Sequence, residues 1–192
     1  MELSNPLISE YTWANKPSVA PLGQIICITD IGENGSLWRG NGTKWVRMHS
    51  IRYYDLTTAV ALTGTTVETT LVTITIPAGL IGSKGKVKLY PLFSATNNTN
   101  NKTVRIKLGG STGYFLQSYS YAQLSNLVIF RNFNSESVQK VSSGLPAGLG
   151  STGGSFTSLT IDTSAATTIT ITGQLAVGTD TMTLEDLFVE VV

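Results

Sequence analysis

The side chains that most often carry catalysis are scarce in this sequence, which holds one histidine, His49, and one cysteine, Cys27. A zinc site needs three or four closely spaced His, Cys or carboxylate ligands, and the HExxH and CxxC patterns are absent. A GxSxG spacing occurs once, at residues 109–113 around Ser111, but it lies between two candidate strands and not at a strand-to-helix turn, so it is not the nucleophile elbow that a Ser-His-Asp triad built on His49 would need. Cys27 lies in the apolar run 25–28, where a free cysteine usually packs as a small hydrophobe. We therefore expect no metal, no cofactor and no nucleophilic active site.

Paired carboxylates are the remaining route to an enzyme, because glycoside hydrolysis needs two acids about 5–9 Å apart. Glu185 and Asp186 are neighbours in an extended segment, where successive side chains point to opposite faces. Asp162 and Asp180 border the ends of candidate strands, where acids commonly form turns. These positions predict a protein that is not an enzyme.

The charge balance argues against a polyanionic partner. The 13 basic and 12 acidic residues leave a net charge of +1, so no overall field attracts nucleic acid. Only 13% of the residues are charged, while about one residue in seven is threonine, which predicts a neutral, hydroxyl-rich surface. No apolar run approaches the roughly 18 residues that span a bilayer, and no secretory signal is evident. We expect synthesis in a cytoplasm, with neither membrane nor nucleic acid as partner.

Four basic residues alternate with apolar ones in two candidate strands: Lys86 and Lys88 in the first, Arg105 and Lys107 in the second. Because the apolar residues between them should face inward, the four cations are expected on the outer face of neighbouring strands. Two interpretations remain open. The patch is either a solvated face that protects a sheet edge, or a contact for an acidic partner or an anionic glycan.

A β framework must position these side chains, and the sequence predicts one through its period of two. Segments 70–77, 103–108 and 167–177 alternate apolar with polar residues, as half-buried strands do. Further candidate strands are 53–62, 86–95, 114–120, 124–133, 137–141, 156–162 and 181–192. No segment indicates a helix. We predict an all-β fold, with an antiparallel β-sandwich of the jelly-roll type over residues 50–192.

One candidate strand contains an unbroken apolar run: Leu127, Val128, Ile129 and Phe130. Such a strand must be covered on both faces, either by a second layer of the chain or by another subunit. We favour the second option, because closed homo-oligomers commonly form over an extra apolar face. The four residues are therefore predicted to lie in a subunit interface.

Residues 1–49 are predicted to form an extended N-terminal arm followed by a small β-hairpin module. The arm is too apolar to be a disordered tail, so Tyr11 and Trp13 should pack on the chain's own domain, a sister subunit or a larger assembly. We interpret the arm and the module together as the attachment part of the protein.

The hairpin of this module carries the clearest local signal. Asn41-Gly42 predicts a two-residue type I′ turn, which would place Trp38 opposite Trp45. The two indoles would then form the centre of a mini-core, and an exposed aromatic platform for sugar or protein is the alternative. Two loops also stand out: 97–101 is expected to be a polar hairpin tip between adjacent strands, and 142–154 a long loop whose leucines dock against a surface.

Two stretches resemble known phage modules. TWANKPS (12–18) and GQIICITDIGENGSLWRGNGTKWVRM (23–48) resemble a small module of bacteriophage tail-fibre and other virion proteins. IPAGLIGSKGKVKLYPLFSATNNTNNKTVRIKLGG (76–110) is similar to the opening of trimeric jelly-roll domains on phage surfaces. The resemblance implies a homotrimeric, non-catalytic component of the virion surface, anchored to other virion proteins through its N-terminal part.

The resemblance leaves two placements on the particle. A capsid decoration or head-fibre protein would bind the shell by its arm and module, which we favour because no heptad, collagen-like or β-helical shaft repeat is present. A receptor-binding tail-fibre protein would instead present its loops, or the basic patch, to a host surface polysaccharide.

Overall fold

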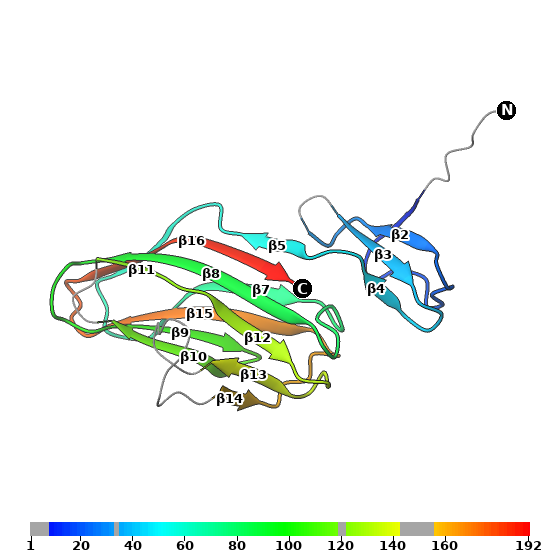
Figure 1. Cartoon of the computed structure of the whole chain (residues 1–192). Coiled ribbons are helices and arrows are strands. Elements are labelled where there is room, and N and C mark those ends of the chain that lie inside the picture. Colours follow the sequence, from blue (N-terminus) through cyan, green and yellow to red (C-terminus); the bar gives the residue numbers. More distant parts are fainter. Residues whose placement is uncertain (1–7, 33–34, 119–121, 143–155) are drawn as a thin grey trace.

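The computed structural model of the chain describes residues 8–32, 35–118, 122–142 and 156–192. Within these ranges the chain forms strands and turns but no helix, so it contains no apolar helix that could cross a membrane. Figure 1 shows a small sheet near the N-terminus and a larger sandwich beside it. The predicted all-β, antiparallel sandwich of the jelly-roll type is confirmed.

The small sheet has four strands in the order β1-β2-β3-β4. Their bounds are β1 Ser9–Tyr11, β2 Ile25–Ile28, β3 Ser36–Gly40 and β4 Trp45–Arg47. β1 is parallel to β2, and the other pairs are antiparallel. The arm therefore contributes strand β1, Ser9–Tyr11, to the sheet of the module and is not a free extension there.

The hairpin between β3 and β4 differs from the prediction. Trp38 pairs with Arg47 and Gly40 with Trp45, so the loop contains four residues, not two, and the Trp38–Trp45 pairing is wrong. The Asn41 side chain explains the longer loop, because its Oδ1 accepts hydrogen bonds from the amides of residues 43 and 44 at 3.1 and 2.9 Å. This Asx-type closure replaces the type I′ turn.

The sandwich consists of two sheets. One has the order β10-β9-β15-β7; the other has the order β14-β13-β12-β8-β16-β5, with β11 also on β8 and β6 also on β16. The bounds are β5 Ile51–Asp55, β6 Val60–Thr63, β7 Thr69–Ile76, β8 Lys86–Ala95, β9 Lys102–Leu108, β10 Ser111–Ser118, β11 Gln123–Ser125, β12 Val128–Asn132, β13 Gln139–Ser142, β14 Phe156–Leu159, β15 Thr167–Leu175 and β16 Thr181–Val191.

Apolar residues at every second position fill the space between the sheets. Ile106, Ile169 and Ile171 from the smaller sheet and Leu89 and Val189 from the larger one are fully buried. Threonines and charged residues alternate with them toward solvent, as the period of two predicted.

The chain passes from one sheet to the other between β8 and β9. Residues 96–101 therefore connect opposite layers, and the prediction that 97–101 joins adjacent strands as a hairpin tip is wrong. The second loop that the sequence singled out, 142–154, lies outside the described residues from position 143 onward.

Candidate functional site

The predicted basic patch is divided between the two layers of the sandwich. Lys86 and Lys88 belong to β8 in the larger sheet, whereas Arg105 and Lys107 belong to β9 in the smaller one. Because the outer faces of a sandwich point away from each other, the prediction of one patch on neighbouring strands is wrong.

Three of these cations are also neutralised by carboxylates. Lys88 Nζ lies 2.8 Å from Glu190 Oε2, and the hydrogen bond from Lys88 lowers the pKa of Glu190. Glu68 accepts from Lys107 at 2.7 Å and from Arg105 at 3.1 Å. Hydrogen bonding, chiefly from Lys107, lowers the pKa of Glu68. The smaller sheet therefore presents Arg105 and Lys107 as an ion-pair cluster with Glu68. On the larger sheet, by contrast, Lys86 pairs across the strands with Arg131, and neither of these two cations forms an ion pair within the described residues.

The side chains of the apolar run 127–130 point alternately to the two faces of the larger sheet. Val128 and Phe130 pair with Leu89 and Val87 and are fully buried in the chain's own core, so they need no second layer or subunit. The reason is that the run is only four residues long, which is two inward-outward cycles of an ordinary strand. The interface prediction is wrong for these two residues.

Leu127 and Ile129 point the other way, toward the outer face of the larger sheet. Leu127 is 45% exposed, and Tyr90 and Leu92 are exposed on the neighbouring strand β8. Phe188 of β16 stacks on Tyr90 with ring centroids 5.2 Å apart. We call these five residues, Tyr90, Leu92, Leu127, Ile129 and Phe188, the apolar strip.

The aromatic residues of the predicted attachment module point inward. Trp38 is only 4% exposed, and its indole N–H donates to Ser36 Oγ at 2.8 Å. Trp13 packs against Trp38 with ring centroids 5.0 Å apart. Tyr11 and Trp45 are half-buried against the same core. The mini-core interpretation fits this packing, with Trp13 in the position that the prediction gave to Trp45.

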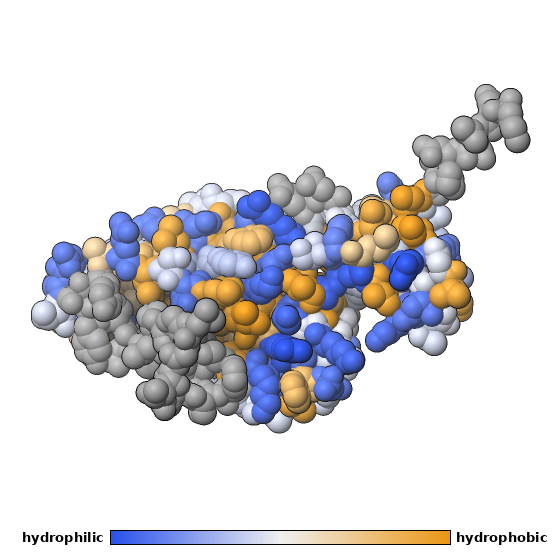
Figure 2. All heavy atoms as spheres, in the orientation of Figure 1, coloured by the Kyte–Doolittle hydropathy of each residue, from blue (hydrophilic) through white to orange (hydrophobic). Residues whose placement is uncertain are grey.

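Trp13 also joins the module to the sandwich. Its indole N–H donates to Ala78 O at 3.2 Å, and Arg47 Nη2 of β4 donates to Ile81 O at 3.4 Å. Both acceptors lie in the segment 77–85 that connects β7 to β8. Figure 2 shows the surface narrowing sharply between the two bodies at this junction.

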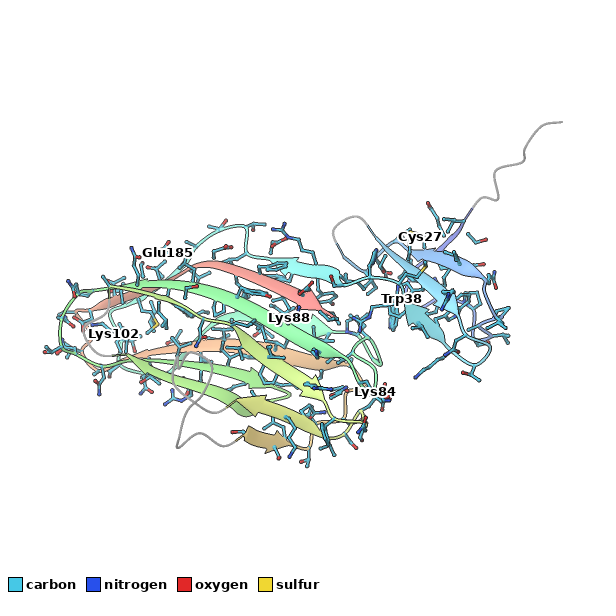
Figure 3. The ribbon with its side chains drawn as sticks, viewed as in Figure 1. Cys27, Trp38, Lys84, Lys88, Lys102 and Glu185 are labelled. Carbon is cyan, nitrogen blue, oxygen red and sulfur yellow. The ribbon has the colours of Figure 1, made fainter. Side chains whose placement is uncertain are left out.

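A cleft of about 1100 Å³ opens at this junction. The module contributes all three tryptophans of the chain together with Lys16, Lys44 and Arg47, and the sandwich contributes residues 78–85, Glu136 and Val192. We call it the junction cleft. Figure 3 shows Trp38 on the module and Lys84 on the facing loop of the sandwich.

The cations of the junction cleft lack carboxylate partners. None of the ion pairs within the described residues includes Lys16, Lys44, Arg47 or Lys84. Lys16 Nζ lies 3.9 Å from the centroid of the Trp13 ring, and burial lowers the pKa of Lys16 despite the charge of Asp30. Burial also lowers the pKa of Arg47 to about 10.

Arg47 has a further unsatisfied donor. Its Nη1 is buried without a hydrogen-bond partner within the described part of the chain, and the guanidinium lies 5.8 Å from the centre of the Trp38 ring. An uncompensated buried charge is costly, so this is a position where an anion would be stabilised.

A buried polar network holds the sandwich wall of the cleft. The side-chain Nδ2 of Asn132 donates to Gly82 O and to Thr163 Oγ1, both at 2.7 Å. The backbone N–H of Asn132 donates to Gly85 O at 3.0 Å. Gln139 Nε2 donates to Asn132 Oδ1 at 3.0 Å. The loop 82–85 is thereby tied to β12 and β13.

A second polar cluster lies at the far end of the sandwich, where Figure 3 shows Lys102. Lys102 is 2% exposed, and its Nζ donates to Asn98 Oδ1 at 2.5 Å and lies 3.5 Å from Asp180 Oδ2. Asp180 also accepts from the amides of Asn98 and Asn100 at 2.7 and 3.0 Å. Every polar group in this cluster has a partner, which indicates a clamp on the loop 96–101.

The carboxylate pair of β16 differs from the prediction. The pairing with β8 shifts register between Leu184 and Asp186, and both Glu185 and Asp186 are exposed instead of facing opposite ways. Ser94 Oγ donates to Glu185. A search of the described residues finds no group of three His, Cys, Asp or Glu side chains that could hold a metal ion.

The comparisons with known proteins give no family. No family model matches the chain, and no curated protein matches its sequence. A CBM36-1 domain of a multidomain xylanase from the hindgut metagenome of Trinervitermes trinervoides aligns at 15% identity over 69% of this chain and 75% of its own, with a TM-score of 0.36.

Two further solved structures align at least as weakly. The insecticidal delta-endotoxin Cry8Ea1 from Bacillus thuringiensis gives 9% identity over 68% of this chain and 19% of its own, with a TM-score of 0.35. The structure of the infectious bursal disease virus Gx strain gives 12% identity over 83% of this chain and 44% of its own, with a TM-score of 0.23. All three TM-scores lie below 0.5, so these likenesses say nothing about what the chain binds.

Sequence reasoning missed the cleft cations Lys16, Lys44 and Lys84. All three lie outside the strands, where lysine is ordinarily solvated. Two of them are close in sequence to a tryptophan: Lys16 follows Trp13 by three residues, and Lys44 precedes Trp45. This closeness of a lysine to a tryptophan in the sequence is the signal that could have pointed to Lys16 and Lys44.

Proposed function

We propose that the protein is a non-enzymatic structural component of a bacteriophage virion, attached through residues 1–49 and displaying the jelly roll on the particle surface. The observation that carries the proposal is the two-part architecture: a small sheet that incorporates the arm as β1, followed by a sandwich whose first strand begins at Ile51. The phage resemblance of segments 12–48 and 76–110 agrees with this division. Synthesis in the host cytoplasm precedes assembly.

The displayed unit is proposed to be a homotrimer that associates through the apolar strip. The strip lies on an antiparallel sheet, and two of the ion pairs beside it are formed within the chain, Lys88 with Glu190 and Arg52 with Asp55. A face whose charges are already neutralised loses less solvation energy when another copy covers it. Leu127 and Ile129 thus keep the interface role that the sequence suggested.

Capsid decoration or a head fibre is the favoured placement, because the sequence contains no shaft repeat. A receptor-binding tail-fibre protein is the second candidate, favoured by the unpaired cations of the junction cleft, which suit an anionic host polysaccharide.

The location on the particle tests the proposal. Antibodies against the jelly roll, or a particle reconstruction by electron microscopy, should place the protein on the shell. Density at the tail tip would replace the first candidate by the second, and absence from purified particles would refute the virion role. Deletion of residues 1–49 should abolish rebinding of the purified protein to particles that lack it.

A further inference from the structure

We propose that the junction cleft binds an acidic saccharide, with a sugar carboxylate held by the cations of the cleft and the sugar rings lying against its indoles. This goes beyond a structural role in the virion, because it assigns a ligand class and binding residues to a cleft that the structural role does not use, and it deepens the receptor-binding candidate.

Charge is the first reason for this assignment. Lys16, Lys44, Arg47 and Lys84 line the cleft with a single carboxylate, Glu136, whereas the whole chain has a net charge of only +1. The cleft thus carries a local excess of positive charge that the balance of the whole chain does not show. A cleft lined by one sign of charge focuses the field and raises the local concentration of counter-charged ligands.

The uncharged lining favours a sugar over other anions. Trp13 and Trp45 are half-buried, so each leaves part of its surface in the cleft, and the hydroxyls of Ser18, Thr43 and Ser83 surround them. Indole surface packs against the C–H groups of a pyranose ring, while hydroxyls exchange hydrogen bonds with those of the sugar. The sandwich wall is a loop without a strand edge, so it offers an acidic peptide no backbone ladder.

The cleft is also organised in advance of binding. A Cβ on Gly85 would lie 1.8 Å from Ile81 O, so the loop 81–85 closes on itself as tightly as the backbone permits. Asn132 fixes the same loop from below through Gly82 and Gly85. A wall that is already ordered loses little conformational entropy when a ligand binds.

Tryptophan fluorescence provides a direct test, because the chain has three tryptophans and all three line the cleft. The full-length protein is titrated with two acidic probes, trigalacturonate and sialyllactose, and with their neutral counterparts galactotriose and lactose. We expect at least one acidic probe to change the emission saturably and to bind about tenfold or more tightly than its neutral counterpart. Raised salt should weaken that binding.

Charge reversal identifies the site. Lys44→Glu with Lys84→Glu changes one exposed lysine on each wall, and we expect about a tenfold or greater loss of affinity for the acidic probe. The matched control is Arg39→Glu with Arg131→Glu, which reverses one exposed arginine on each body outside the cleft and should bind within about twofold of the parent.

Three results would overturn the inference. They are no saturable change with either acidic probe, equal binding of the neutral counterparts, and equal loss of affinity in the control pair. Hexaglutamate binding as tightly as the acidic sugars would also overturn it, in favour of an acidic peptide. None of these outcomes bears on the location of the protein in the virion, so failure here leaves the structural role standing.

Discussion

Gly40, the last residue of β3, touches the segment that precedes β2 more closely than any side chain would allow. A Cβ at this position would lie 2.0 Å from Pro21 O, and the Gly40 amide donates to Gln24 O at 2.8 Å. The small sheet has little core of its own, so this backbone contact accounts for much of its closure.

Gly40→Ala should destabilise the module by about 2–3 kcal/mol, because a clash with backbone cannot be relieved by a change of rotamer. Urea denaturation followed by tryptophan fluorescence measures the effect. Gly178→Ala is the control, since its Cβ would come no closer than 3.7 Å to Gly64. Equal unfolding midpoints for the two variants would contradict the close contact.

Asp180 gives the far end of the sandwich a pH dependence. Burial acts to raise its pKa, but hydrogen bonds from Asn98 and Asn100 and the charge of Lys102 outweigh it, and the pKa is lowered from 3.8. The stability that Asp180 contributes is therefore complete above pH 3.8 and is lost as the pH falls through the lower pKa of the folded state.

Asp180→Asn should flatten the decline of melting temperature between about pH 4 and pH 2. Melting curves of both proteins across this range test the expectation. Asp186→Asn, on the exposed outer face, should keep the steeper decline of the parent. Parallel curves for the parent and Asp180→Asn would show that the clamp does not titrate in this range.

At the residue scale, the sequence predicted side-chain direction better than side-chain partnership. The segments 103–108 and 167–177 alternate as predicted, whereas the run 127–130 was predicted to be covered on both faces and in the structure alternates like an ordinary strand. The Lys102 clamp was missed because Asn98 and Asp180 lie 82 residues apart, and nothing local marks a lysine as buried.

The elements around Asn132 show how one side chain can hold several segments together. Asn132 ends β12, and its amide group connects the loop 82–85, Thr163 and Gln139 of β13. Deleting this side chain removes one hydrogen bond to each of three segments at once.

Asn132→Ala should cost about 2–3 kcal/mol, because it removes three buried side-chain hydrogen bonds that each contribute about 0.5–1.5 kcal/mol. The backbone amide of Gly85, which donates to Gly82 O at 3.3 Å, should exchange its hydrogen faster, because the loop loses the hydrogen bond from Asn132 Nδ2 to Gly82 O while keeping the backbone one to Gly85 O. Chemical denaturation and hydrogen exchange measure both effects. Asn134→Gly, at an exposed residue with φ of 57°, is the control and should change stability by less than about 0.5 kcal/mol. Unchanged exchange at Gly85 in the Asn132 variant would contradict the anchoring role.

At the element scale, strand positions were predictable and pairing was not. Segment 86–95 was predicted with the bounds that β8 has, because its period of two, with Val87, Leu89 and Phe93 inward, continues through Pro91. The register of β3 and β4 was wrong by two residues because the hydrogen bonds of Asn41 decide the turn, and an Asn-Gly pair is compatible with both loop lengths.

The whole molecule exposes the apolar strip on the outer face of its larger sheet. If the strip is the trimer contact, Tyr90→Glu with Leu127→Glu should convert trimers into monomers, because a charge placed there would be desolvated in the interface. Light scattering at micromolar concentration measures the mass, and far-UV circular dichroism checks that the fold persists.

Val67→Glu serves as the control, since Val67 is 69% exposed but lies outside the strip. It should remain trimeric. A monomeric parent protein, or a trimeric Tyr90/Leu127 variant, would refute the proposed interface.

At the scale of the whole molecule, the fold class was predictable from the many short alternating strands, but the division into two layers was not. Residues 96–101 could equally have formed a hairpin, and a hairpin would have joined the four basic residues of β8 and β9 into one patch. The junction cleft could not be predicted from the sequence either, because Lys16 and Lys84 line one cleft only after both bodies have folded.

The position of β16 has a consequence for how the protein is made. β16 is synthesised after every strand that it pairs with, yet it lies between β8 on one side and β5 and β6 on the other. Until it leaves the ribosome, the larger sheet lacks its central member, and β5 and β8 expose unpaired edges. A translation product truncated before Thr181 therefore has no route to the native sandwich, so interrupted synthesis yields chains that cannot complete the larger sheet.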